Sequence, residues 1–249
     1  MIGAFALCLC VIEPLASTGD NHGVWFVGDQ DPAIVEFDST TKGFDYSLCF
    51  RVANNEYINI NRLSHRPVDI VMHHGVIWFI DYTSSVALYS LERQGEKSHN
   101  VSLQGIMESE SAPTDLVSMQ DTVCVCFGNQ TLQVHTFDGD GWDQLPSLDV
   151  SYARVASFNG TLLAAAPHEL GAALWEYENG EWNKSAVVTL QGIFASIEVK
   201  DDWPLLVSVE NHQGNIVGLQ HMVPVHIASF PIPKGRWSTI PSPDGICVL

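Results

Sequence analysis

Four short apolar segments separated by three polar turns follow one another between residues 115 and 148. The strands predicted from them are residues 116–119, 122–127, 131–137 and 142–148. Their lengths, and the Gly, Asp and Asn residues between them, are typical of strands joined by tight turns. Because turns this short allow only neighbouring strands to pair, the stretch predicts a four-stranded antiparallel sheet.

The second strand of this unit recurs along the whole chain. Equivalent positions are Phe26, Phe79, Cys126, Ala165 and Ser208, at intervals of 53, 47, 39 and 43 residues. The mean interval of about 45 residues is the period of a four-stranded propeller blade. These strands are apolar on both sides, as expected where each blade is covered by its neighbours. The sequence therefore predicts an all-β fold, a β-propeller of four-stranded antiparallel blades, with five blades plus a partial sixth.

Two parts of the chain are distinguished by composition. Residues 13–249 contain no linker rich in Pro, Gly or Ser, and we expect them to form one propeller domain. Residues 1–12 are an apolar segment that is too short to cross a bilayer as a helix. Two interpretations of this segment stay open, the hydrophobic region of a signal peptide and a strand that closes the ring.

The blade pattern begins again near the last residue. Residues 238–242 have the place of a first strand, and residues 246–249 have that of an apolar second strand. From this we expect an incomplete sixth blade and a chain that is a fragment of a longer propeller. Open blade faces and strand edges favour association.

An aromatic residue, a glycine turn and a tryptophan recur in consecutive units. The two copies are Phe137-DGDG-Trp142 and Tyr177-ENG-Glu181-Trp182. This pattern resembles the kelch and galactose-oxidase central-domain type of propeller, although the glycine doublet of kelch repeats is missing from every copy. The resemblance implies a propeller fold. It does not imply an oxidase, since no copper-ligating Tyr or His position carries over to this sequence.

The charge balance restricts the partners. The chain has 11 Lys and Arg against 29 Asp and Glu, a formal net charge of -18. Such a surface repels phosphate backbones, so we expect no nucleic-acid partner. Cations, basic proteins and neutral sugars fit it better, and an unknown protein or carbohydrate is the expected ligand. We expect no membrane span in the chain and an extracytoplasmic location, with a cytoplasmic one as the alternative.

Few side chains suggest chemistry. Cys124 and Cys126 lie two apart in a predicted strand and are interpreted as small buried apolar residues. His73 and His74 are neighbours at a strand end, where side chains point to opposite faces and cannot jointly hold one ion. Asp138-Gly139-Asp140-Gly141 lacks the later acidic ligands of a calcium loop and is interpreted as a turn. We expect no metal, no cofactor and no catalytic residue.

The absence of the common catalytic motifs favours a non-catalytic binding or interaction propeller. The alternative is a glycan-acting hydrolase or lyase, which requires two carboxylates about 5 to 9.5 Å apart. Candidates for that pair are Asp29, Asp81 and Glu169.

Polar side chains follow the second strand of each predicted blade. Because strands alternate in direction, these loops should gather on one face at the mouth of the fold, which is the usual place of a binding site. The candidate ligand-binding residues are Asp29, Asp31, Asp81, Tyr82, Asn129, His168, Glu169, Asn211 and His212. His74 and Asn159, in turns between first and second strands, should lie on the opposite face.

Overall fold

The structure, a computed structural model, describes residues 14–20, 23–29, 46–52, 56–63, 67–93, 99–200, 203–220, 222–232, 239–242 and 245–248. Within these ranges all of the regular secondary structure is β-strand, and no helix has the length and hydropathy needed to cross a membrane. The segment at residues 1–12, for which a signal peptide or a closing strand was predicted, lies outside the described residues.

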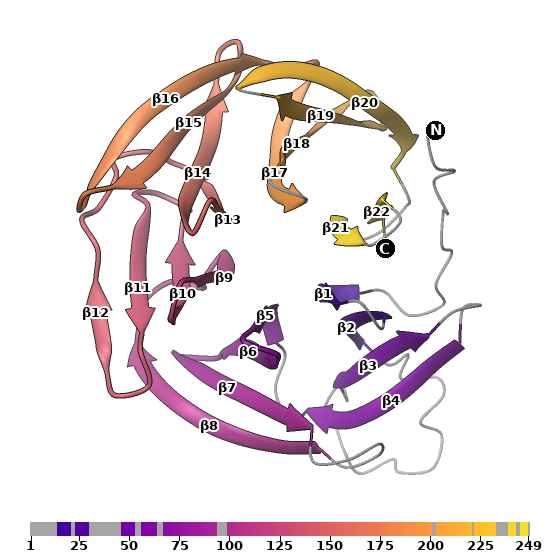
Figure 1. Cartoon of the computed structure of the whole chain (residues 1–249), viewed down its shortest axis with the longest axis vertical. Helices are drawn as coiled ribbons and strands as arrows, with labels where there is room; N and C mark the ends of the chain where they lie inside the picture. The colour runs from indigo at the N-terminus through magenta and orange to yellow at the C-terminus, as the bar shows by residue number, and fades with distance from the viewer. Residues whose placement is uncertain are drawn as a thin grey trace. The chain divides into compact units, whose positions relative to one another are not determined.

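The chain divides into two compact units. Unit 1 consists of Met1–Ala112 and Lys234–Leu249, and unit 2 consists of Pro113–Pro233. Each unit has its own antiparallel sheets, which are drawn in sequence colours in Figure 1.

Unit 1 contains two four-stranded sheets and one two-stranded sheet. The first inner strand, β1, contacts the first strand of the second sheet, β5, and also β21. The strands of unit 1 are β1 (Pro14–Asp20), β2 (Gly23–Asp29), β3 (Tyr46–Val52), β4 (Glu56–Leu63), β5 (Pro67–His73), β6 (Val76–Tyr82), β7 (Ser85–Arg93), β8 (His99–Glu108), β21 (Thr239–Ser242) and β22 (Gly245–Val248).

Unit 2 contains three four-stranded sheets whose strands pair in sequence order. Their first strands, β9, β13 and β17, contact one another in turn, and β12, β16 and β20 are the outer strands (Figure 1). The strands are β9 (Asp115–Met119), β10 (Thr122–Phe127), β11 (Gln133–Phe137), β12 (Trp142–Gln144), β13 (Arg154–Phe158), β14 (Thr161–His168), β15 (Gly171–Glu178), β16 (Glu181–Thr189), β17 (Ile193–Lys200), β18 (Trp203–Glu210), β19 (Gln213–Gln220) and β20 (Val223–Pro231).

These sheets confirm the predicted four-stranded antiparallel blade. The prediction of five blades plus a partial sixth concerns a single closed or open ring. It stays a prediction, because the described sheets belong to two separate units. Two strands are shorter than predicted. The third strand, expected at residues 131–137, begins at Gln133. The outer strand expected at residues 142–148 ends at Gln144, and Leu148 rejoins the sheet only through an isolated bridge to Leu132. Pro146, which has no N–H to donate, interrupts the pairing.

Strand β14 shows why the second strands are apolar on both sides. Leu163 and Ala165 belong to the core shared with the sheet β17–β20, whereas Leu162 and Ala164 belong to the core shared with β9–β12. All four side chains have no exposed surface. Because successive side chains of a strand point to opposite faces, this strand supplies two cores at once. The prediction of doubly covered second strands is confirmed for β14.

The turn between β13 and β14 is the hairpin that its sequence predicts. Asn159 has a φ of 50° and Gly160 a φ of 74°, so both residues adopt the left-handed conformation of a type I′ turn. Asn and Gly tolerate that conformation better than other residues. The two-residue turn fixes the register in which Phe158 faces Thr161.

The acidic turn at residues 138–141 is held by its own backbone. Asp138 Oδ1 accepts hydrogen bonds from the N–H groups of Asp140, at 2.9 Å, and Gly141, at 3.1 Å. These bonds favour the charged carboxylate and lower the pKa of Asp138, with the Asp140 N–H as the largest cause. The interpretation of this segment as a turn is confirmed.

Candidate functional site

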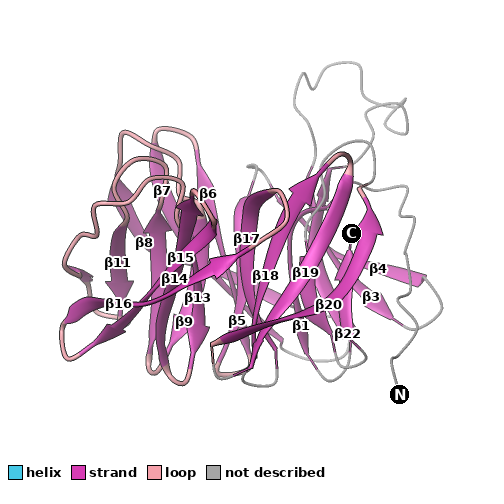
Figure 2. Cartoon of the chain, turned by 90° about the horizontal axis from the view of Figure 1, so that it is seen from above, coloured by secondary structure: helices cyan, strands magenta, loops and turns pink. Residues whose placement is uncertain are grey.

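Strand direction brings a set of loops to one end of unit 2. In each sheet the loop after the second strand lies at the end where the first strand begins. One backbone bond joins two of these ends between sheets, from Ala153 N–H to the Gly128 carbonyl at 2.8 Å. A second bond, from Leu190 N–H to the Leu170 carbonyl at 3.0 Å, continues the pairing of β16 with β15 within one sheet. We call this end the loop face of unit 2, made of residues 128–132, 145–153, 169–170, 190–192 and 211–212 with the strand residues that adjoin them. Figure 2 shows the strands running between the two ends of the sheets.

Five of the predicted ligand-binding residues lie on or beside the loop face. Asn129, Glu169, Asn211 and His212 are exposed there. His168 is half-buried at the end of β14, and its Nδ1 accepts a hydrogen bond from the Leu170 N–H at 3.3 Å. Asn159, which was predicted to lie on the opposite side, is at the other end of this sheet, in the turn between β13 and β14.

The remaining predicted residues belong to unit 1. Asp81 is 6% exposed and therefore buried, and the Tyr82 hydroxyl donates to the Ser109 carbonyl at 3.4 Å. Asp29 ends β2, but its side chain lies outside the described part, as does the whole of Asp31. His74 is exposed in the turn between β5 and β6, at the opposite end of its sheet from Tyr82.

The prediction that the side chains of His73 and His74 point to opposite faces of the strand is wrong. Their centroids lie 4.2 Å apart, because His74 has a φ of 49° and has left strand geometry. His73 is buried and His74 is exposed. The described residues contain no group of three or more His, Cys, Asp or Glu side chains able to hold a metal ion.

The two thiols of β10 are buried free cysteines, as the sequence predicts. Burial raises the pKa of Cys124 to about 12, against a smaller lowering by its contact with the Thr122 hydroxyl. A thiol with so high a pKa is a poor nucleophile near neutral pH.

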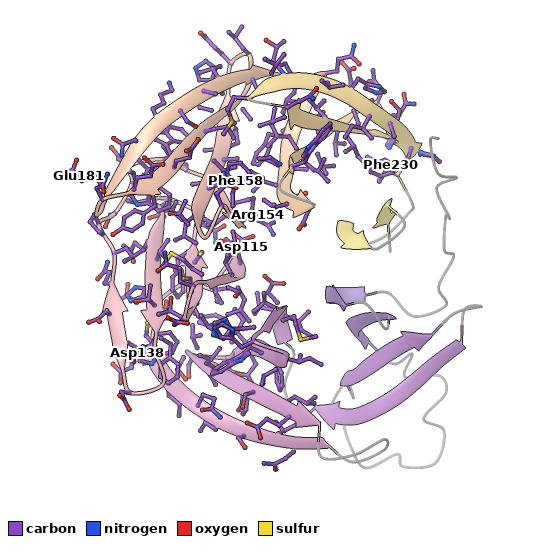
Figure 3. All side chains as sticks on the ribbon, viewed as in Figure 1. Asp115, Asp138, Arg154, Phe158, Glu181 and Phe230 are labelled. Carbon is purple, nitrogen blue, oxygen red and sulfur yellow. The ribbon has the colours of Figure 1, made fainter. Side chains whose placement is uncertain are left out.

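An ion pair that the sequence reasoning missed joins two inner strands. Arg154 Nε donates to Asp115 Oδ1 at 2.7 Å, with the side chain of Asp115 9% exposed and that of Arg154 40% exposed. Figure 3 shows the two side chains at the inner strands β9 and β13, while Asp138 and Glu181 lie at the outer strands. The sequence does contain a signal for this ion pair, because two consecutive first strands begin with residues of opposite charge.

Three large apolar side chains on the loop face are exposed to solvent. Tyr152 is 69% exposed, Leu170 is 55% exposed and Ile193, the first residue of β17, is 74% exposed. They come from three successive connections of unit 2, and sequence reasoning overlooked them because it considered only polar loop residues. Large apolar side chains that stay exposed on one face are a feature of interaction surfaces.

No family model and no curated protein matches the sequence. Solved structures match its fold. A nidogen/laminin complex matches with a TM-score of 0.60 and 12% identity, covering 90% of this chain and 80% of that chain. A luciferin-regenerating enzyme matches with a TM-score of 0.55 and 11% identity, covering 97% and 80%. The β-propeller domain of the trilobed protease from Pyrococcus furiosus matches with a TM-score of 0.52 and 8% identity, covering 92% and 88%. At such identities the likeness shows the fold alone, and that fold is a β-propeller with four-stranded antiparallel blades.

Proposed function

We propose that the chain is a non-catalytic binding propeller and that the loop face of unit 2 receives a protein partner. The observation that carries this proposal is the set of three exposed apolar side chains, Tyr152, Leu170 and Ile193, on a single face. Interfaces draw most of their binding free energy from a few side chains that become buried in the complex, and Tyr is prominent among them.

The backbone of Tyr152 gives further support. This residue has a φ of 56°, a left-handed conformation that costs an L-residue about 1–2 kcal/mol. Its side chain is also largely exposed, so packing within the chain gives little in return. Strained backbone of this kind clusters at functional sites.

The alternative of a glycan-acting enzyme gains no comparable support. Asp81 is buried in unit 1, whereas Glu169 is exposed in unit 2. The side chain of Asp29 lies outside the described part. The extracytoplasmic location and the kelch or galactose-oxidase type remain proposals that rest on the sequence.

A library of random twelve-residue peptides displayed on phage tests the proposal. The library is selected on the full chain and on the variant Tyr152→Ser/Leu170→Ser/Ile193→Thr. A matched control, Val187→Thr/Val223→Thr/Val225→Thr, changes three exposed apolar residues of the outer strands β16 and β20. Circular dichroism melting checks that each variant folds.

We expect peptides that bind the full chain and the outer-strand control and that lose binding to the loop-face variant. Binding that survives in the loop-face variant would refute the assignment of the partner to this face. A selection that enriches no peptide would refute the proposal of a protein partner. If the full chain and the outer-strand control bind glycans on an array and the loop-face variant does not, the partner is a carbohydrate.

A further inference from the structure

Each of the three exposed apolar residues of the loop face has an exposed carboxylate close to it in the sequence or across the strand pair. Glu169 directly precedes Leu170, and Asp149 lies three residues before Tyr152 in the same connection. Glu210 follows Val209, the residue that pairs with Ile193 across the sheet. Three successive connections therefore present the same combination of an apolar side chain and a negative charge.

Positive charges are scarce in unit 2. Residues 113–233 contain fourteen Asp and Glu against three Lys and Arg. Lys184 lies on the outer strand β16 with its Nζ 5.8 Å from the centre of the Trp175 ring. Arg154 forms the ion pair with Asp115 described above. Of these two cations, Lys184 is thus on an outer strand and Arg154 is engaged by Asp115.

A buried acceptor lies beside the same face. Asp115 is the first residue of β9, and its Oδ2 is buried without a hydrogen-bond partner among the described residues. A buried acceptor that lacks a donor is unfavourable.

We propose that the partner is a cationic protein segment in which Lys or Arg residues alternate with apolar residues. This inference rests on the proposed function of the loop face and adds the chemistry of its partner. The apolar residues of the segment contact Tyr152, Leu170 and Ile193, and its cations lie against Asp149, Glu169 and Glu210. An extended segment fits this arrangement, because successive side chains leave a strand on opposite sides and so separate its apolar residues from its cations.

Exposed ion pairs are individually weak, so the negative charge contributes mainly to the association rate and to the choice of partner. Three pairs together should still change affinity about tenfold. The dependence on salt should be strong, since exposed charges are screened over a Debye length of about 8 Å at physiological ionic strength.

The test uses three synthetic twelve-residue peptides in which Val alternates with Lys, with Glu or with Ser. Fluorescence anisotropy measures their binding to the full chain at low and at physiological salt. The variant Asp149→Asn/Glu169→Gln/Glu210→Gln removes the three carboxylates. Its matched control, Asp140→Asn/Asp143→Asn/Glu181→Gln, removes the same charge from exposed positions at the outer strands.

We expect only the Lys peptide to bind the full chain. Its affinity should fall about tenfold in the loop-face carboxylate variant and stay almost unchanged in the control variant. Equal weakening in both variants would overturn the inference, because it would show an effect of net charge without a site. Equal binding of the Ser peptide, or no binding of the Lys peptide, would also overturn it.

The outcome is distinguishable from failure of the proposed function. If the phage selection gives peptides that need Tyr152, Leu170 and Ile193 but have no excess of Lys and Arg, the loop face remains a binding surface and the cationic partner is wrong. If the selected peptides do not need those three residues, the proposed function itself is wrong.

Discussion

Arg154 donates a hydrogen bond to Asp115 across 2.7 Å, and the two residues begin neighbouring inner strands that are 39 residues apart in the sequence. The sheets β9–β12 and β13–β16 are otherwise held together mainly by apolar side chains, including Cys124 and Leu162. The ion pair therefore adds a directional contact to a non-directional core. It also fixes the inner end of the loop face.

Replacing Arg154 by Gln should lower the free energy of unfolding by about 1–3 kcal/mol, because the mostly buried Asp115 loses the partner of its Oδ1. Urea unfolding measures the change. Lys184→Gln removes a cation from an exposed position over Trp175, and we expect a loss below about 1 kcal/mol there. A double variant with Asp115→Asn should lose less than the sum of the two single changes. A loss below about 0.5 kcal/mol for Arg154→Gln would mean that the pair is not structural.

Gly128 should not tolerate a side chain. A Cβ at this position would overlap the carbonyl oxygen of Ala153, in the connection that leads into the next sheet. Because this neighbour is backbone and is held by the bond from Ala153 N–H to Gly128, it cannot move aside cheaply. We expect Gly128→Ala to cost about 2–3 kcal/mol in urea unfolding.

Gly141 is the matched control for this change. It has open space around its Cβ position and no positive φ, so Gly141→Ala should be neutral or stabilising by up to about 1 kcal/mol. Similar costs for the two substitutions would show that the contact at Gly128 is not close.

Phe79 should carry a large share of the stability of its sheet. It is 3% exposed in β6, and its ring stacks on that of Tyr89 with centroids 5.1 Å apart. Truncation to Ala should cost about 3–5 kcal/mol, since it removes buried apolar area and leaves a cavity. Leu103→Ala, at a residue of β8 that is 52% exposed, should cost less than about 1 kcal/mol in the same urea titration. Equal costs would contradict the burial of β6.

The sequence predicted the repeating unit because blade formation depends on local signals. Short apolar strands and tight turns such as Asn159-Gly160 fix pairing between neighbours in the chain. The double covering of β14 followed from its uninterrupted apolar run. The outer strand after Trp142 was predicted too long, since a proline near the end of an apolar stretch was given too little weight.

The candidate site was predicted less well because it depends on contacts between neighbouring sheets of the repeat. The polar residues Asn129 and His212 were found from loop position alone. Tyr152 and Ile193 were overlooked, since an apolar residue in a sequence predicts burial and only the fold shows which ones are left exposed. The proximity of His73 and His74 depended on a positive φ, which a non-glycine residue rarely adopts.

The thiol of Cys124 should resist alkylation in the folded chain. With a pKa of about 12, the thiolate is about one part in ten thousand of the thiol at pH 8, and burial restricts access as well. Because the raised pKa lies above the measured range, the rate should rise about tenfold per pH unit from pH 7 to pH 9 without a plateau. Iodoacetamide labelling with mass mapping of the peptide that holds residues 124 and 126 measures this, with the urea-unfolded chain as the reactive reference. Labelling of the native chain within minutes at pH 8 would contradict the burial.

Tyr152→Gly should change stability and binding in opposite directions. Glycine adopts a φ of 56° without strain, which recovers about 1–2 kcal/mol, and its greater freedom in the unfolded chain offsets about 0.5–1 kcal/mol of that gain. The net free energy of unfolding should therefore rise by about 0.5 kcal/mol, since the largely exposed ring adds little packing. Binding of the alternating Lys and Val peptide should weaken, because an exposed aromatic contact is lost.

Asn159→Gly is the control. Asn159 has a φ of 50° at the opposite end of the sheet, and because Asn tolerates this conformation, stability and binding should both stay nearly constant. A loss of more than about 1 kcal/mol of stability in Tyr152→Gly would mean that the ring supports the fold, and its strain could then no longer be assigned to binding.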